Sequence, residues 1–382
     1  MARREILGLH IVGEGIGECI ILELPNAAPA VIDCGNLEVA DYAINFIKRE
    51  LGWDRVSFIA ITHPHGDHFL GLSRVLDAFA SRCGGLWVFP GFFQGDSINR
   101  YLRWIELTNP KTDFDATFFC DAVRREWILF SEFATHHKIL PRVMRTDEPC
   151  MEGEVEIRCL LPCGNVADAF ERDLSQCAPS KDWLDNFPNS PAVELPDPPE
   201  ANHASSVLSI VWGSTRLILC GDCELPSWNA WNAIGRKLAG DIHGLKIGHH
   251  GSSNGAFKGL VDCLNKKTYA VVTPYRRGKS PLPDEKTIKV YDKQCGFLRI
   301  TAPSKSVAVI VEDAGAVLRA FGAAIDDPTS TAAKLLKLHA KVQQHENVVG
   351  VLFDDKGNSV DQYWGKGTGR IAFTDSSKAK SL

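Results

Sequence analysis

The sequence predicts an α/β fold in which one edge of a β-sheet carries a metal site. Three apolar runs, at residues 56–62, 215–220 and 242–248, are typical of buried strands, and each ends in residue types that bind divalent metals. Helical periodicity follows the first two runs, so strands and helices alternate along the chain. Because α/β layers assemble sites where strand ends gather, we expect the three strand ends to lie together.

The first strand is followed by a short loop with four metal-ligand residues, His63, His65, Asp67 and His68, within six positions. Imidazole nitrogen and carboxylate oxygen are donors that zinc-like metals prefer. The alternate residues His63 and His65 can converge on one ion, and Asp67 and His68 then face a second. A solvated polar loop is the alternative interpretation, but four such residues directly after a buried strand favour a two-metal site.

The second and third strands end in further ligand residues. The second closes on Gly221-Asp222, and the third leads into His249 and His250. A Gly-Asp pair alone is common in turns, but the repetition at a third strand end favours metal binding. Cys220 and Cys223 have the spacing of a redox or zinc motif. If Asp222 is a ligand at the strand end, the flanking cysteines are incidental.

The His-x-His-x-Asp-His loop after a strand resembles the signature of the metallo-β-lactamase superfamily. This resemblance implies a four-layer αββα sandwich with two metal ions at one sheet edge, and it implies that Asp222 bridges the two ions. Superfamily members with a di-iron redox site carry Glu at the position of His65. The resemblance therefore implies a hydrolase rather than an oxidoreductase.

Residues 202–206, 221–222 and 245–252 resemble one branch in particular, the soluble hydrolase domain attached to bacterial DNA-uptake channel proteins of the competence type. The resemblance covers residues 5–275, apart from an insertion. The branch usually carries Gly-His-Pro after the next strand, whereas residues 280–283 read Ser-Pro-Leu-Pro. His203 is a candidate substitute for the missing histidine. No membrane channel accompanies the domain, so DNA transport is not implied.

These arguments give three groups of candidate residues. The metal ligands are His63, His65, Asp67, His68, Asp222, His249 and His250, with one or both of the last two binding metal. The catalytic candidates are Asp67 and His203, and the weaker substrate candidates are Asn202, Lys246 and Ser252.

The other elements follow from periodicity and turn residues. Proline-rich residues 178–200 are interpreted as a loop or lid. In the first 140 residues we expect a hairpin of residues 19–24 with 30–33, a helix over 39–51, a strand at 86–89 and a helical segment within 97–140. After residue 200 we expect a hairpin of 206–212 with 215–220, a strand at 269–273 and a helix near 288–291. Strands at 298–301 and 307–311 are expected to complete the second half of the sandwich, and a helix over 330–345 and a strand at 348–353 follow.

Two regions are expected on this basis. Residues 1–325 form the hydrolase domain, with an insertion at about residues 90–200. Residues 326–382 form a small C-terminal α+β module with a frayed tail, which serves packing or a protein partner.

Composition is ordinary for a globular chain, with 45% hydrophobic and 23% charged residues and a formal net charge of −5. No global basic field therefore indicates nucleic-acid binding. The N-terminus does not have the pattern of a secretory signal, and no apolar run of about 18 residues predicts a membrane span. With 12 cysteines and no export signal, we expect reduced thiols and a cytoplasmic location.

The expected activity is hydrolysis by a metal-bridging hydroxide, because two ions lower the pKa of a shared water from ~15.7 toward ~7. Zn²⁺ is the expected metal, and Mn²⁺ or Fe²⁺ suits the same donors. A phosphodiester in nucleic acid or a nucleotide is the first substrate hypothesis. It is supported by the branch resemblance and by a local basic run, Lys266, Lys267, Arg276, Arg277 and Lys279. The alternatives are a thioester, lactone or other small ester, and a non-catalytic metal-bearing interaction scaffold.

Overall fold

The computed structural model describes most of the chain. The described residues are 5–13, 15, 17–91, 100, 125–126, 128–145, 149–187, 189, 200–238, 240–276, 281–302, 308–310, 348–364 and 370–372.

The first β-sheet has eight strands and mixes antiparallel with parallel pairs. The parallel pairs join β3 to β4, β4 to β5 and β5 to β6. In spatial order the strands are β16 (Ser359–Trp364), β15 (Val348–Phe353), β1 (Leu7–Gly13), β2 (Glu18–Glu23), β3 (Ala30–Ile32), β4 (Ile59–Ile61), β5 (Leu86–Val88) and β6 (Arg142–Val143).

The second sheet has seven strands and is also mixed, with parallel pairs from β10 through β11 and β12 to β13. In spatial order its strands are β13 (Phe297–Ile300), β12 (Tyr269–Val272), β11 (Gly244–Lys246), β10 (Thr215–Leu219), β9 (Val207–Trp212), β8 (Val155–Leu161) and β7 (Cys150–Glu152). A separate two-stranded sheet pairs β14 (Ala308–Ile310) with β17 (Arg370–Ala372).

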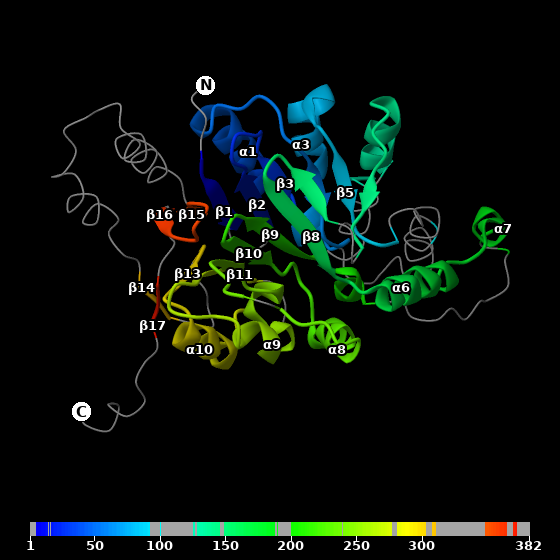
Figure 1. The fold of residues 1–382 in the computed structure, drawn as a ribbon. Helices are drawn as coiled ribbons and strands as arrows, with labels where there is room; N and C mark the ends of the chain where they lie inside the picture. The colour runs from blue at the N-terminus through cyan, green and yellow to red at the C-terminus, as the bar shows by residue number, and fades with distance from the viewer. Residues whose placement is uncertain are drawn as a thin grey trace.

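Helices cover the outer face of each sheet. In Figure 1 α1 and α3 lie on one side of the strands, and α8, α9 and α10 lie on the other. The helical elements are α1 (Leu37–Asn45), η1 (Phe46–Glu50), α2 (Gly66–Phe69), α3 (Leu72–Phe79), η2 (Ala80–Arg82), α6 (Gly164–Gln176), α7 (Lys181–Asp185), η4 (Ala201–Ala204), α8 (Leu225–Ala233), η5 (His249–Gly251), η6 (Ser253–Gly255), α9 (Lys258–Val261) and α10 (Glu285–Gln294).

Three apolar cores match the three interfaces of a four-layer sandwich. Alternate residues of one strand face different cores, as the two-residue period of a strand requires. On β2, Leu22 packs between the sheets, whereas Ile21 packs against the first helix layer. On β10, Leu217 packs between the sheets, whereas Ile218 packs against the second helix layer. The predicted α/β class and αββα sandwich are therefore confirmed.

Three strands, β6, β7 and β8, lie inside the range that was expected to be an insertion, and β6 pairs with β5 in the first sheet. Strand β8 pairs with β9 in the second sheet, and β7 pairs with β8. Val155, Ile157, Cys159 and Leu161 of β8 are buried, whereas the three residues that alternate with them are partly exposed. This alternation is typical of a half-buried strand, so part of the supposed insertion belongs to the sandwich.

The C-terminal strands also differ from the expected arrangement. Strand β15 lies within the expected C-terminal module, yet it pairs with β1 and extends the first sheet. Strand β14, expected to complete the second half of the sandwich, pairs instead with β17. The expected helix over residues 330–345 lies outside the described residues, and the boundary at residue 325 stays a prediction.

The cysteines among the described residues are free thiols. Cys220 and Cys223 are buried, and burial raises the pKa of Cys220 to about 12 and that of Cys223 well above its usual value. A protonated, buried thiol is a poor nucleophile, so this pair lacks the character of a redox site. No helix in the described parts of the chain is long and apolar enough to cross a membrane.

Candidate metal centre

The candidate ligands follow the carboxyl ends of parallel strands in both sheets. Strand β4 leads into the loop that begins at His63, β10 leads to Asp222, and β11 leads to His250. Open α/β sheets bind ligands outside the carboxyl ends of their strands, because the connecting loops converge there. The structure brings the three strand ends together, as the sequence analysis expected.

One group of donors consists of His63, His65 and Asp222, whose donor atoms all lie within 4.8 Å of one another. The ring centroids of the two histidines are 4.8 Å apart. Two imidazoles and one carboxylate are a donor set that suits zinc and similar divalent metals.

A second group consists of Asp67, His68, Asp222 and His250, again with donor atoms within 4.8 Å of one another. The Nε2 atom of His68 lies 3.6 Å from Asp67 and 3.5 Å from Asp222. The Nε2 atom of His250 lies 3.0 Å from Asp67 and 3.4 Å from Asp222. Asp222 belongs to both groups, so its carboxylate lies where it could bridge two ions.

Three of the histidines are held at Nδ1, which leaves Nε2 facing the cluster. Such contacts fix the ring orientation and tautomer of a metal-binding histidine. The pairs are His63 Nδ1 with the Thr62 hydroxyl at 3.0 Å, His68 Nδ1 with Asp33 Oδ2 at 2.7 Å, and His250 Nδ1 with the Thr273 carbonyl at 3.2 Å.

The cluster contains buried polar atoms without hydrogen-bond partners among the described residues. They are Nε2 of His63, Nε2 of His68 and Oδ1 of Asp222. Buried polar atoms are usually paired, and unpaired ones cost free energy. These three atoms all face the same cluster, so the residues present fit divalent metal ions.

The protonation states of His63 and Asp222 suit metal binding. Burial lowers the pKa of His63 well below its usual value, and the neighbouring His68 lowers it further, so His63 is a neutral imidazole. Burial acts to raise the pKa of Asp222, but His250 and His68 outweigh it and hold that pKa well below its usual range. Neutral imidazole and ionised carboxylate are the forms that bind metals. Burial acts to lower the pKa of His68 and of His250, but the carboxylates of Asp222 and Asp67 outweigh it and raise both, so these two rings must release a proton when they bind a metal.

Part of the cluster is built on left-handed backbone. The φ angles of Asp33, His249 and His250 are 58°, 45° and 51°. Residues other than glycine rarely adopt such angles, and they cluster at functional sites, where the surrounding structure holds them in place.

A buried ion pair lies beneath the ligands. Lys246 and Glu18 are fully buried, with Nζ 2.7 Å from Oε1. The other carboxylate oxygen of Glu18 accepts a hydrogen bond from the Thr273 hydroxyl and lies 3.7 Å from His250 Nδ1. Lys246 was a candidate substrate contact, but an ammonium group enclosed in this way does not reach a substrate.

The remaining candidates surround the cluster without joining the donor groups. His249 pairs through Nδ1 with Glu224 at 3.0 Å, and Asn202 donates to the same carboxylate at 3.1 Å. Of the two adjacent histidines, only His250 belongs to a donor group. Ser252 accepts a hydrogen bond from the Asn254 amide at the start of η6.

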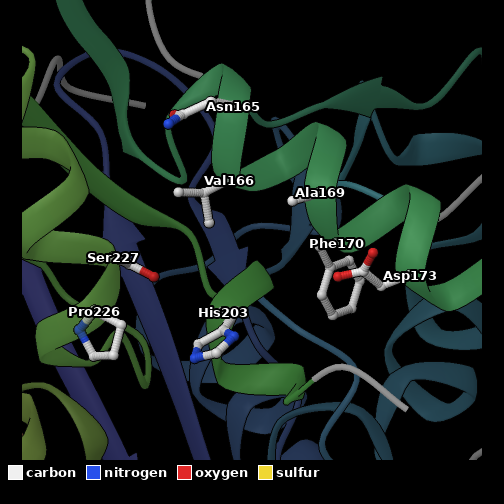
Figure 2. A pocket seen from close by; sticks show the side chains of 8 residues that line it. All are labelled: Asn165, Val166, Ala169, Phe170, Asp173, His203, Pro226 and Ser227. Carbon is white, nitrogen blue, oxygen red and sulfur yellow. The ribbon is translucent and has the colours of Figure 1, made fainter. Parts of the chain in front are cut away.

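His203 lines a cavity of about 310 Å³ between α6, η4 and α8. Figure 2 shows His203 among the side chains around this cavity, with Pro226 of α8 on one side of it and Phe170 of α6 on the other. No donor residue is among the described residues that line this cavity. His203, which does line it, directly follows Asn202 in the sequence.

Four residues around the cluster were not among the sequence candidates, namely Glu18, Asp33, Thr273 and Glu224. Asp33 directly follows the apolar strand β3 in the sequence Asp-Cys-Gly, which was an available signal. Glu18 is a charged residue at the start of an apolar strand, which was a second signal. Thr273 and Glu224 have no distinguishing pattern in the sequence.

The basic run is divided by the fold. Lys266 and Lys267 precede β12, whereas the cluster lies beyond the carboxyl end of that strand. Lys266 donates to the carbonyls of Lys293 and Cys295. Arg276 follows β12 and lies beside Gly15. The last two members of the run, residues 277 and 279, lie outside the described residues.

A family model of the metallo-beta-lactamase superfamily matches residues 12–81, from β1 to η2, which includes the His63–His68 loop. The comparison with curated proteins found no match. Among solved structures, the metallo-beta-lactamase fold protein YhfI from Bacillus subtilis is 10% identical, with 64% of this chain and 70% of that chain covered and a TM-score of 0.32.

Two further solved structures are similar at low identity. Tm1679, a metal-dependent hydrolase of the beta-lactamase superfamily, is 11% identical, with 80% of this chain and 100% of that chain covered and a TM-score of 0.37. Zn²⁺-bound PqqB from Methylobacterium extorquens is 10% identical, with 63% of this chain and 71% of that chain covered and a TM-score of 0.34.

Proposed function

We propose that this chain is a metal-dependent hydrolase of the metallo-β-lactamase superfamily that works with two divalent metal ions. The observation that carries the proposal is the sharing of Asp222 by two donor groups at one sheet edge. The match of the superfamily model to residues 12–81 supports it independently. The αββα sandwich is consistent with that superfamily.

In this proposal His63 and His65 would hold the first ion, and His68 and His250 would hold the second, with Asp222 available to both. Bound metals would supply a nucleophilic water at neutral pH and positive charge for the oxyanion that develops in the transition state. Zn²⁺ suits these donors, and Mn²⁺ or Fe²⁺ could use the same set.

The protein's own residues position the reaction. Asp67 is partly exposed and lies 3.0 Å from His250, so its carboxylate can hold the attacking water as well as a metal. Asp33 keeps the proton of His68 on Nδ1 by accepting it at 2.7 Å, which leaves Nε2 free to bind. No serine or cysteine nucleophile is needed.

We propose a phosphodiester as the substrate. The two donor groups contain two carboxylates, Asp67 and Asp222, whereas two divalent ions bring four positive charges. With the hydroxide bound, the loaded site would therefore carry a net charge of about +1, which attracts an anionic substrate. The likeness of residues 202–206 and 245–252 to the competence-type branch points the same way.

A neutral thioester, lactone or small carboxylic ester is the second candidate, because the same donors would polarise its carbonyl group. An extended nucleic acid has less support than a small phosphodiester. Lys266 and Lys267, which could hold the phosphates of a nucleic acid, lie before β12, whereas the cluster lies beyond the other end of that strand. The cytoplasmic location and a partner for the C-terminal residues stay predictions.

The test combines metal content with hydrolysis. Metal per chain is measured by mass spectrometry, and hydrolysis of bis(p-nitrophenyl) phosphate is measured on the same sample. We expect about two metals and turnover in the wild type, and loss of turnover in His65→Ala. His136→Ala is the matched control, since that histidine lies exposed on a helix and should leave both readings unchanged.

Other outcomes separate the alternatives. Two metals with turnover only of p-nitrophenyl acetate or a lactone would move the assignment to ester hydrolysis. Metals without turnover of any of these substrates would favour a metal-bearing scaffold. A chain that binds no metal would refute the proposal.

A further inference from the structure

The cavity beside the cluster has no part in metal binding. Its walls are α6, η4 and α8, and its volume of about 310 Å³ lies near the lower limit for small-molecule sites, which run from about 300 to 1,000 Å³. Figure 2 shows side chains from all three helices directed toward the same space. The volume suits one compact group rather than a polymer.

The lining of the cavity favours an uncharged ring. Val166, Ala169 and Phe170 come from α6, and Pro226 comes from α8. None of the described lining residues is Lys or Arg, and the carboxylate of Asp173 would repel an anion. Flat apolar and aromatic side chains pack well against aromatic rings. A phosphate group is therefore not expected in this cavity.

One hydroxyl in the cavity has no partner. Ser227 is 1% exposed, and its Oγ forms no hydrogen bond with the described residues. Figure 2 shows this oxygen directed into the space between α8 and α6. Buried hydroxyl groups are normally paired, so an unpaired one that faces a cavity indicates a polar atom of a ligand.

Two of the elements that line the cavity, α8 and η4, lie close to the cluster. Helix α8 begins three residues after Asp222, with Glu224 between them as the N-cap residue. His203 directly follows Asn202, whose Nδ2 lies 3.5 Å from His249 Nε2. A group bound in the cavity would therefore lie next to a group bound at the metals.

We propose that this cavity binds an aromatic ring of the substrate, with a polar atom of the ring or of its substituent hydrogen-bonded to Ser227. The proposal rests on the proposed function, because the phosphodiester of the same molecule would lie at the metals. The ring packs between Phe170 and His203. The substrate class is thus a small phosphodiester that carries an aryl group or a nucleobase.

The test compares two non-hydrolysable probes with the same anionic group, 4-nitrobenzylphosphonate and methylphosphonate. Binding to the metal-loaded full chain is measured by calorimetry. Burying a ring favours binding by at least about tenfold, so we expect the nitrobenzyl probe to bind about tenfold more tightly. Ala169→Trp fills the cavity and should remove this preference while leaving the affinity for methylphosphonate unchanged.

Two further variants make the test specific. Ser227→Ala removes the hydroxyl. It should lower the affinity for the nitrobenzyl probe by about three- to tenfold and leave the affinity for methylphosphonate unchanged. If Ala169→Trp fails to fold, the affinity of Ser227→Ala for the nitrobenzyl probe decides whether the ring site stands. Gln176→Trp is the control, because it adds the same bulk to an exposed position at the end of α6 and should change neither affinity.

The outcomes distinguish this proposal from the proposed function. Equal affinity for both probes in the wild type, or a preference that both cavity variants keep, would overturn the ring site and leave the hydrolase proposal standing. If the wild type prefers the nitrobenzyl probe and the cavity variants lose that preference, the ring site is supported. If the same chain cleaves no phosphodiester, the phosphodiesterase proposal is refuted separately. Binding of neither probe would overturn the ring site, and turnover of bis(p-nitrophenyl) phosphate by the same sample would then decide the phosphodiesterase proposal.

Discussion

Replacing Lys246 with methionine tests how much the buried ion pair beneath the metal ligands contributes to the stability of the fold. Met has nearly the length of Lys but no charge, so Lys246→Met leaves the carboxylate of Glu18 buried without its partner at 2.7 Å. Breaking a buried pair from one side costs about 3–5 kcal/mol. The Thr273 hydroxyl still donates to Glu18, so we expect a loss near the lower end, about 3 kcal/mol.

Removing both charges should cost less than removing one. In Glu18→Gln/Lys246→Met neither of these two positions carries a charge, and the Gln carbonyl can still accept from Thr273. Replacing a buried pair with neutral groups of similar volume is often nearly neutral. We therefore expect the double variant to recover about 2 kcal/mol relative to Lys246→Met, which is a coupling that neighbouring residues can show.

The assay is urea denaturation of the metal-free chain at pH 7, followed by circular dichroism and tryptophan fluorescence. Lys258→Met is the control, because Lys258 is 85% exposed and pairs with Asp262 on the surface, so its loss should be too small to measure. The reasoning is refuted if Lys246→Met unfolds with wild-type stability. It is also refuted if the double variant loses the sum of the two single losses.

Three further predictions concern the same centre. Asp33→Asn should lower metal affinity about 10–100-fold, because Asn holds His68 less firmly; competition with a chromophoric chelator measures this. Asp222→Ala should leave less than one metal per chain, whereas His63→Ala should leave about one, as mass spectrometry can determine. Gly221→Ala should lower the unfolding free energy by more than about 1 kcal/mol, because φ is +49° and a Cβ would lie 2.6 Å from a serine hydroxyl; thermal melting measures this.

Each of these variants has a matched control. Asp41→Asn changes an exposed carboxylate and should leave chelator competition unchanged. Gly235→Ala has φ +76° with nothing within 4 Å of the added carbon, so it isolates the backbone cost from the steric one. Metal content in His136→Ala should equal that of the wild type. If Gly221→Ala were no less stable than Gly235→Ala, the steric argument would be wrong.

The donor residues were accessible from the sequence because they follow strands directly. His63, His65, Asp67 and His68 lie in one six-residue loop, and the ends of β10 and β11 repeat the pattern. Local spacing is enough to recognise such sites, because each ligand occupies a fixed place relative to its own strand.

The support beneath the donors could not be predicted in this way. Glu18 and Thr273 are 255 residues apart in sequence and meet only when the two sheets pack. Two adjacent histidines were equivalent in the sequence, and only the folded structure distinguishes them: His250 joins a donor group, whereas His249 pairs with Glu224. Strand β15 was expected, but its pairing with β1 depends on contacts between distant segments.

That pairing has a consequence for synthesis on the ribosome. Strand β1 is buried along its whole length, but one of its edges is completed by β15, which begins 335 residues after β1 ends (348 − 13). Synthesis adds about 5–20 residues per second, so this edge of β1 stays unpaired for roughly 17–67 s before β15 is made. An open apolar edge can pair with another chain. A nascent chain of this protein should therefore need protection by a chaperone until β15 has left the ribosome.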